Sequence, residues 1–336
     1  MSSQVRAAIP ASASSDGATA LRAVVRDWLS RVPKLPLPGR GETLPRWRTL
    51  AAIARDDVCA IKVLEAHYDA LAILAELHHP LPGSRSQESA LYAVWAAEPP
   101  DARLVFVAGP DGNGTLNGTK AWCSGADLVD AALVTAYRDE QRVLVRVSLE
   151  EPGIARVGDD WQAVGMARVE SGRLSFRNVR AVQVGDPGAY LSRPGFWHGG
   201  AGIAACWFGA ATAIADTLRT QTRVAGNPHA MAHLGAIDMA LSAAASLLRE
   251  TAVLIDAQPE LPHSIAVTRV RSVVERSCTE IIDRVGRALG PGPLCEDGAH
   301  ARRCADLTTF IRQSHAERDW AALGEAAQAG DRTWLL

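Results

Sequence analysis

The order in which helical and strand patterns follow one another is the feature that most limits the fold of this 336-residue chain. Residues 44–77 repeat apolar side chains with a helical period, whereas residues 90–184 are short β-rich runs separated by turn sequences. From residue 195 the helical period returns in four long segments, 198–224, 228–257, 264–289 and 298–328. Helices, then strands, then four long helices is an uncommon order, and it predicts an α+β multidomain protein.

Prolines, glycines and turn dipeptides set the predicted domain boundaries. We predict a disordered tail over 1–17, an N-terminal helical domain over 18–89, a central antiparallel β-barrel or sandwich over 90–194 and a C-terminal four-helix bundle over 195–330. Strands at this spacing, with no helix between them, are typical of an antiparallel β domain.

Net charge, cysteine spacing and apolar stretches limit the expected partners of the protein and the cellular compartment in which it is expected. The formal net charge of -2 gives no electrostatic reason to expect nucleic acid or an anionic membrane as a partner. The cysteines form no CxxC pair, so we expect buried free thiols and a reducing compartment. The tail lacks the apolar segment of a secretory signal, and the apolar stretch 199–215 is Gly/Ala-rich like a core helix. A cytoplasmic protein that does not span a membrane is expected.

Three segments carry more specific patterns. They are VWAAEP at 94–99, LNGTKAWCSGA at 116–126, and a third motif that consists of WQAVGMA at 161–167, Ser171-Gly172 and LSFRNV at 174–179. In this order they resemble the strand-to-loop motif, the Asn-Gly-x-Lys hairpin and the Gly-Met segment of the acyl-CoA dehydrogenase superfamily. The resemblance implies that superfamily's fold, in which an N-terminal helical domain, a β domain and a four-helix bundle follow one another. It also implies FAD as the cofactor.

The resemblance assigns one face of the cofactor site to the β domain. It implies that Trp122 packs against the isoalloxazine and that the Ser124 hydroxyl bonds to the flavin edge. Trp95 and Ala97 would run beside the ring, although Ala97 replaces a Thr whose side chain helps bind the flavin in the family. A flat apolar surface with hydrogen-bond partners along one edge is what a flavin requires.

Residues of the bundle would hold the rest of FAD. The resemblance places Arg223 and Arg287 near the diphosphate, Gly290 in the turn that follows, and His233 near the cofactor. The matches are incomplete, because Arg223 lies one place late and Arg287 replaces a Gln. Guanidinium groups suit phosphate oxygens, but an Arg at a helix end is also an ordinary surface residue. His229 and His233 share a helix face without a third ligand, so no metal site is predicted.

The catalytic Glu of the family's dehydrogenases is missing. Its usual place is taken by Ser314 or His315, and the alternative place falls near His198. His315, His198 or Glu317 could act as the base, because imidazole titrates near neutrality and Glu317 lies on the next helical turn. The helix that contains His67 also resembles a monooxygenase branch of the family, which would place His67 near the pocket.

The leading hypothesis is a FAD-dependent oxidoreductase that oxidises an acyl thioester at Cα–Cβ with hydride transfer to flavin N5. Such a protein would form a homodimer or homotetramer and pass electrons to an electron-transfer flavoprotein. The missing Glu keeps two alternatives open, a flavin-dependent monooxygenase on the same fold and a non-catalytic homologue that binds flavin or acyl groups.

Overall fold

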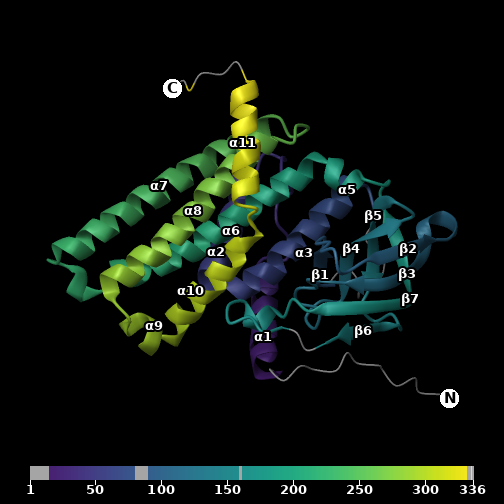
Figure 1. Ribbon diagram of the computed structural model, residues 1–336, viewed down its shortest axis with the longest axis horizontal. Coiled ribbons are helices and arrows are strands. Elements are labelled where there is room, and N and C mark those ends of the chain that lie inside the picture. Colours follow the sequence, from purple (N-terminus) through teal and green to yellow (C-terminus); the bar gives the residue numbers. More distant parts are fainter. Residues whose placement is uncertain (1–14, 80–89, 159–160, 331–333, 335–336) are drawn as a thin grey trace. The chain divides into compact units, whose positions relative to one another are not determined.

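The computed structural model describes residues 15–79, 90–158, 161–330 and 334 (Figure 1). Contacts between residues divide the chain into two compact units. The first unit comprises residues 1–34, 62–163 and 167–193, and the second comprises 35–61, 164–166 and 194–336. The predicted domain boundaries stay a prediction.

The first unit contains α1 (Ser15–Arg31), most of α3 (Val58–Glu76), the short α5 (Ala189–Ser192) and every strand of the described residues. Helix α1 begins inside the tail predicted over 1–17, because its helical pattern extends over small residues that a first turn tolerates. The rest of that tail lies outside the described residues. The helical pattern over 44–77 forms two helices, because Asp57 is extended at ψ 117 between α2 and α3.

The strands form one sheet that closes on itself. The strands are β1 (Tyr92–Trp95), β2 (Leu104–Ala108), β3 (Asn113–Lys120), β4 (Ala131–Arg138), β5 (Gln141–Ser148), β6 (Ile154–Val157) and β7 (Arg173–Val184). Strand order β4-β2-β3-β7-β5 returns to β4, with β1 also on β4 and β6 on β7.

Two strand pairs differ from the antiparallel β domain that was predicted. Strands β1 and β2 both pair parallel to β4, whereas the other pairs are antiparallel. Neither parallel pair is joined by a tight hairpin, and a longer connection allows the chain to re-enter the sheet in the same direction. The sheet is therefore mixed, within the α+β class that the sequence predicted.

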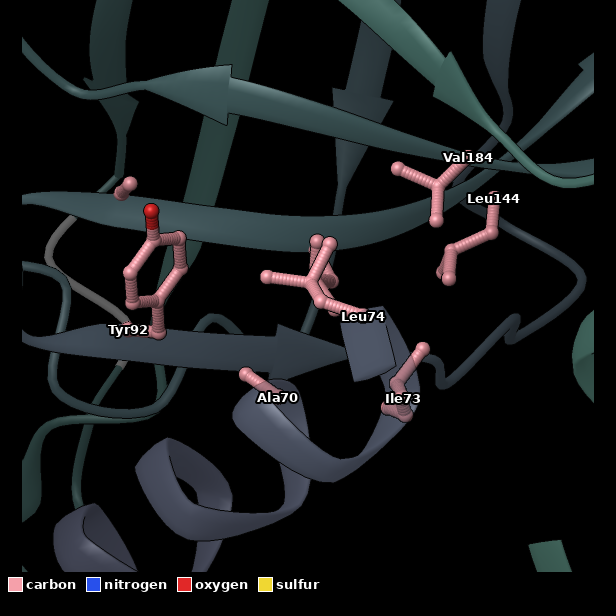
Figure 2. Close-up of a cluster of buried hydrophobic side chains, with 8 residues drawn as sticks. Ala70, Ile73, Leu74, Tyr92, Leu144 and Val184 are labelled. Carbon is pink, nitrogen blue, oxygen red and sulfur yellow. The ribbon is translucent and has the colours of Figure 1, made fainter. Parts of the chain in front are cut away.

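The core of the first unit lies between α3 and the sheet, as Figure 2 shows. Ala70, Ile73 and Leu74 share one face of α3 because their spacing matches one helical turn. They pack against buried side chains of β1, β4, β5 and β7, namely Tyr92, Ala131, Leu133, Leu144 and Val184.

The second unit is helical and is built around α6 (Pro194–Arg219). Helix α6 packs against α2 (Thr43–Asp56), α7 (Pro228–Ala257), α8 (Ser264–Leu289) and α10 (Gly298–Phe310); α9 (Gly292–Glu296) and α11 (Glu317–Ala329) complete the unit (Figure 1). Among the described residues, α6 and α7 are long and apolar enough to span a bilayer. The most apolar window of α6 is 72% buried, as predicted for a core helix, whereas that of α7 is 17% buried.

The last predicted helix, over 298–328, is broken in the structure. Helix α10 ends at Phe310, a 3-10 turn follows at Ile311–Gln313, and α11 begins only at Glu317. Ala316 interrupts the helix with φ 44 and ψ -110. The helical period continues across this break in the sequence, which is why periodicity alone predicted one helix.

Gly209 on α6 allows close packing with α2. A Cβ at position 209 would lie 2.1 Å from the Ala51 carbonyl oxygen, so we expect Gly209→Ala to destabilise the fold by about 1–3 kcal/mol. Gly235 on α7 is exposed and meets nothing within 4 Å, so Gly235→Ala is the matched control and should stabilise by about 0.5–1 kcal/mol. Denaturant unfolding measures both values, and equal effects of the two substitutions would contradict this packing.

Candidate functional site

Trp122 follows β3 and is presented outward from a buried turn. Its neighbours Ala121 and Cys123 are buried, but the Trp122 side chain is 53% exposed. Its backbone has φ 59, a left-handed conformation that aromatic residues rarely adopt. Backbone conformations of this kind cost on the order of 1–3 kcal/mol and cluster at functional sites.

A second indole and two hydroxyls lie beside this turn. The ring of Trp161 meets that of Trp122 edge-on, with centroids 6.2 Å apart. The Nε1–H of Trp161 is buried and has no hydrogen-bond partner among the described residues. The hydroxyl oxygens of Ser124 and Ser171 are 2.7 Å apart, and both residues are partly accessible. The turn therefore combines an exposed apolar surface with polar donors.

Trp95 anchors the turn from the core. It is buried, and its indole Nε1–H donates to the Ser124 carbonyl at 3.1 Å. Ala97, two residues further on, is exposed. The described contact of Trp95 is thus with the protein's own turn.

Lys120 fixes the other side of the turn. Its buried ammonium donates to the Thr135 carbonyl and hydroxyl at 2.8 Å, and the Thr135 hydroxyl donates to the Ala96 carbonyl at 3.4 Å. Burial lowers the pKa of Lys120 to about 8. The end of β3 is thereby linked through β4 to the first motif.

Backbone hydrogen bonds join the second motif to the third. The Cys123 N–H donates to the Gly172 carbonyl at 2.9 Å, and the Gly125 N–H donates to the Val169 carbonyl at 2.8 Å. The structure therefore brings the segments around Trp95, Trp122 and Ser171 together. That these segments of the three motifs meet at one turn is a finding that the motifs alone did not provide.

An ionic cluster supports this meeting point. Arg156 on β6 pairs with Asp127, and its guanidinium lies 3.3 Å from the Glu170 carboxylate. Burial raises the pKa of Asp127, and the Arg156 charge opposes that effect. Arg22 of α1 also donates to the Asp127 carbonyl. Arg156 belongs to none of the three motifs, and nothing local in the sequence marks Asp127 and Glu170 as its partners.

Ser314 and His315, which stand where the family has its catalytic Glu, lie in the break between α10 and α11. Buried Glu275 of α8 pairs with Arg312, and Arg271 donates to the Gln313 carbonyl at 3.3 Å. His315 follows, with its side chain 60% exposed and its Nδ1 3.5 Å from an Asp319 oxygen. Glu317 is exposed at the start of α11.

His198, the third candidate base, is buried and hydrogen-bonded within the protein. It is buried on α6, and its Nε2 bonds to the Leu261 carbonyl at 2.9 Å. Its ring also stacks on His263, with centroids 6.0 Å apart. These contacts tie α6 to the connection between α7 and α8.

Two of the predicted cofactor-binding positions line one groove of about 400 Å³ at the end of α8. Arg287 and Gly290 line it, but the Arg287 guanidinium pairs with Asp283 at 2.7 Å in the same groove. Gly290 ends α8 with φ 71, which favours glycine.

The remaining predicted cofactor residues lie elsewhere in the second unit. His233 is partly exposed on α7, and its Nδ1 is buried with no partner among the described residues. The backbone of Arg223 lies in a 3-10 turn (Thr222–Val224), and its side chain falls outside what the structure describes. Within the described ranges no group of three His, Cys, Asp or Glu residues could hold a metal ion.

His67 lies in the core of the first unit. Its Nδ1 accepts a hydrogen bond from the Tyr92 N–H at 3.2 Å, and its ring stacks on Tyr92. Burial lowers the pKa of His67 to about 4, so the imidazole is neutral at physiological pH.

The buried His67 predicts a pH dependence of stability. Between pH 6.5 and about 4 the unfolded chain protonates this side chain while the folded protein does not, so folding stability falls as the pH is lowered through this window. The loss should be on the order of 3 kcal/mol. His67→Asn keeps an acceptor for the Tyr92 N–H and should flatten the stability curve over this window, measured by denaturant unfolding. Parallel curves for the two proteins would show that His67 does not carry the effect.

No protein-family model matches the chain. Among curated proteins, the chain is 26% identical over 233 residues to a dibenzothiophene monooxygenase of Mycolicibacterium goodii, a match that covers 56% of this chain and 55% of that protein. The chain therefore spans about half the length of this relative.

Solved structures match over nearly the whole chain. TdsC from Paenibacillus sp. A11-2, in complex with FMN and indole, superimposes with a TM-score of 0.72 at 20% identity over 92% of this chain and 94% of that one. KijD3, in complex with FMN and a dTDP-linked amino sugar, gives 0.72 at 17% identity over 95% and 88%. Butyryl-CoA dehydrogenase from Megasphaera elsdenii gives 0.71 at 16% identity over 95% and 100%. The resemblance that the three motifs indicated is thus confirmed at the level of structure, and the chain has the acyl-CoA dehydrogenase fold.

Proposed function

We propose that this protein is a flavin-dependent monooxygenase whose flavin packs on Trp122 and bonds to Ser124. The exposed indole on a left-handed backbone, next to a pair of hydroxyls, is the observation that carries the proposal. An isoalloxazine needs an apolar face and hydrogen-bond partners at its edge, and this turn offers both. The ring of Trp161, edge-on to that of Trp122, adds a second indole beside this surface.

The missing carboxylate favours a monooxygenase over a dehydrogenase. Removal of an α-proton needs a base of suitable pKa within reach of the substrate. At the two places where the family keeps its Glu, this chain has the buried, hydrogen-bonded His198 and the pair Ser314 and His315. A bound reduced flavin supplies oxygen activation without such a base. His315, exposed beside Asp319, stays a proposed catalytic residue.

We further propose FMN as the flavin. Arg287, which the resemblance placed near the diphosphate of FAD, already pairs with Asp283. A carboxylate beside this guanidinium disfavours a phosphate at the same place. The family motifs are Arg-x-x-Phe-Gly and Gln-x-x-Gly-Gly, and this chain has Ala225 in place of the Phe and Pro291 in place of the second Gly. FMN lacks that half, and the similar structures of TdsC and KijD3 contain FMN. FAD remains the alternative that Arg287 and Gly290 favour.

Small aromatic molecules are the proposed substrates, because the dibenzothiophene monooxygenase and the indole complex of TdsC are similar to this chain. Reduced flavin would come from a separate reductase, in place of the electron-transfer flavoprotein expected for a dehydrogenase. A homodimer or homotetramer stays part of the proposal.

The proposal is tested with two electron sources, namely NADH with a flavin reductase and a panel of acyl-CoA thioesters. With FMN, NADH and a flavin reductase, the protein should consume oxygen and hydroxylate or S-oxygenate indole or dibenzothiophene, as measured by mass spectrometry. A panel of acyl-CoA thioesters added without oxygen should leave the flavin oxidised. Bleaching by an acyl-CoA would instead establish the dehydrogenase.

The flavin face is tested by a matched pair of tryptophan variants. Trp122→Ala should weaken FMN binding about tenfold or more, because it removes the apolar face. Trp320→Ala removes another exposed indole, 45% accessible on α11, and should leave the affinity unchanged. Fluorescence titration measures both dissociation constants, and equal affinities for the two variants would rule out Trp122 as the flavin face.

A further inference from the structure

Ser171 lies next to the hydroxyl that the proposed function assigns to the flavin. Its Oγ is 2.7 Å from the Ser124 Oγ, and either atom can be the donor. The two residues are 47 positions apart and come from the second and third motifs. Both are partly accessible beside the exposed Trp122.

The loop that carries Ser171 is held in place from several sides. Two backbone hydrogen bonds join Val169 and Gly172 to the turn that contains Ser124. Glu170, the preceding residue, has φ 42 and pairs with Arg156 at 3.3 Å. A non-glycine residue held in this conformation costs free energy, which the ion pair and the two backbone hydrogen bonds offset. The Ser171 hydroxyl is therefore held in position by its neighbours and does not sit on a free loop.

A serine hydroxyl has one proton and two acceptor lone pairs. If Ser171 donates to Ser124, the Ser124 proton is available to an acceptor on a ligand. If Ser124 donates to Ser171, Ser124 instead presents a lone pair to a donor on a ligand. Rotation of the two hydroxyls thus switches the Ser124 hydroxyl between donor and acceptor without moving a heavy atom.

We infer that Ser171 is a positioning residue that lets the Ser124 hydroxyl bond to both oxidation states of the bound flavin. This inference rests on the proposed flavin site. The N5 position of a flavin accepts a hydrogen bond when oxidised and carries a proton to donate when reduced. Ser124 alone can serve the oxidised state. When the flavin is reduced, Ser124 must turn a lone pair toward the N5–H. The Ser124 proton then keeps a hydrogen-bond partner only because Ser171 can accept it.

The inference is tested by comparing FMN affinity in the two oxidation states in full-length protein. Ser171→Ala should weaken binding of reduced FMN about fivefold relative to oxidised FMN, since one hydrogen bond of about 1 kcal/mol is lost in one state. That ratio converts to a fall of roughly 20 mV in the two-electron midpoint potential. Ser171→Thr keeps the hydroxyl and should restore the wild-type potential.

A double-mutant cycle separates positioning from simple packing. In a Ser124→Ala background, Ser171→Ala should cause no further change in potential, because Ser171 acts through Ser124. Ser175→Ala is the control, since its hydroxyl bonds to the Ala155 carbonyl on the neighbouring strand and should leave the potential unchanged.

The outcomes separate this inference from the proposed function. Wild-type protein that binds neither FMN nor FAD overturns both. Flavin binding with an unchanged potential in Ser171→Ala, or with equal shifts in the presence and absence of Ser124, overturns the role of Ser171 alone. If Ser171→Ala does not fold, Ser171→Cys carries the test, because a thiol is a weak partner and should shift the potential in the same direction.

Discussion

The turn at Trp122 is held in a backbone conformation that an aromatic residue rarely adopts. A left-handed aromatic residue costs free energy, and buried hydrogen bonds on both sides offset that cost. Trp95 ties the turn to the core through the Ser124 carbonyl, and Lys120 ties the end of β3 to the Thr135 position on β4. The segments that contact this turn come from all three motifs.

The fold was largely predictable because each block has its own hydrophobic period. Helical spacing predicted three of the four bundle helices to within a few residues at most of their ends, and turn dipeptides separated the strands. The parallel pairing of β1 with β4 was not predictable, because it depends on where a long connection returns. The break before α11 was missed for a different reason. The break contains a tertiary contact, the pair between Glu275 and Arg312, which the periodicity of one segment does not show.

The candidate site was predictable where a motif is local and not where a role depends on burial. The hairpin indicated Trp122 and Ser124 directly. Burial of His198 and its bond to the Leu261 carbonyl depend on the connection between α7 and α8, which no short sequence pattern shows. The pairing of Arg287 with Asp283 is local, because the two side chains lie one helical turn apart on α8. The sequence marks Ser171 only by its place next to Gly172 in the third motif. Its pairing with Ser124 could be found only from coordinates, because the two residues belong to different motifs.

The account depends on whether the Trp122 turn is the face that binds a flavin. A crystal structure of the protein grown with FMN tests this most directly. The account predicts an isoalloxazine ring against the Trp122 indole, with its edge within hydrogen-bond distance of the Ser124 hydroxyl. A ring bound at another surface, or crystals that remain without flavin at saturating FMN, would contradict it.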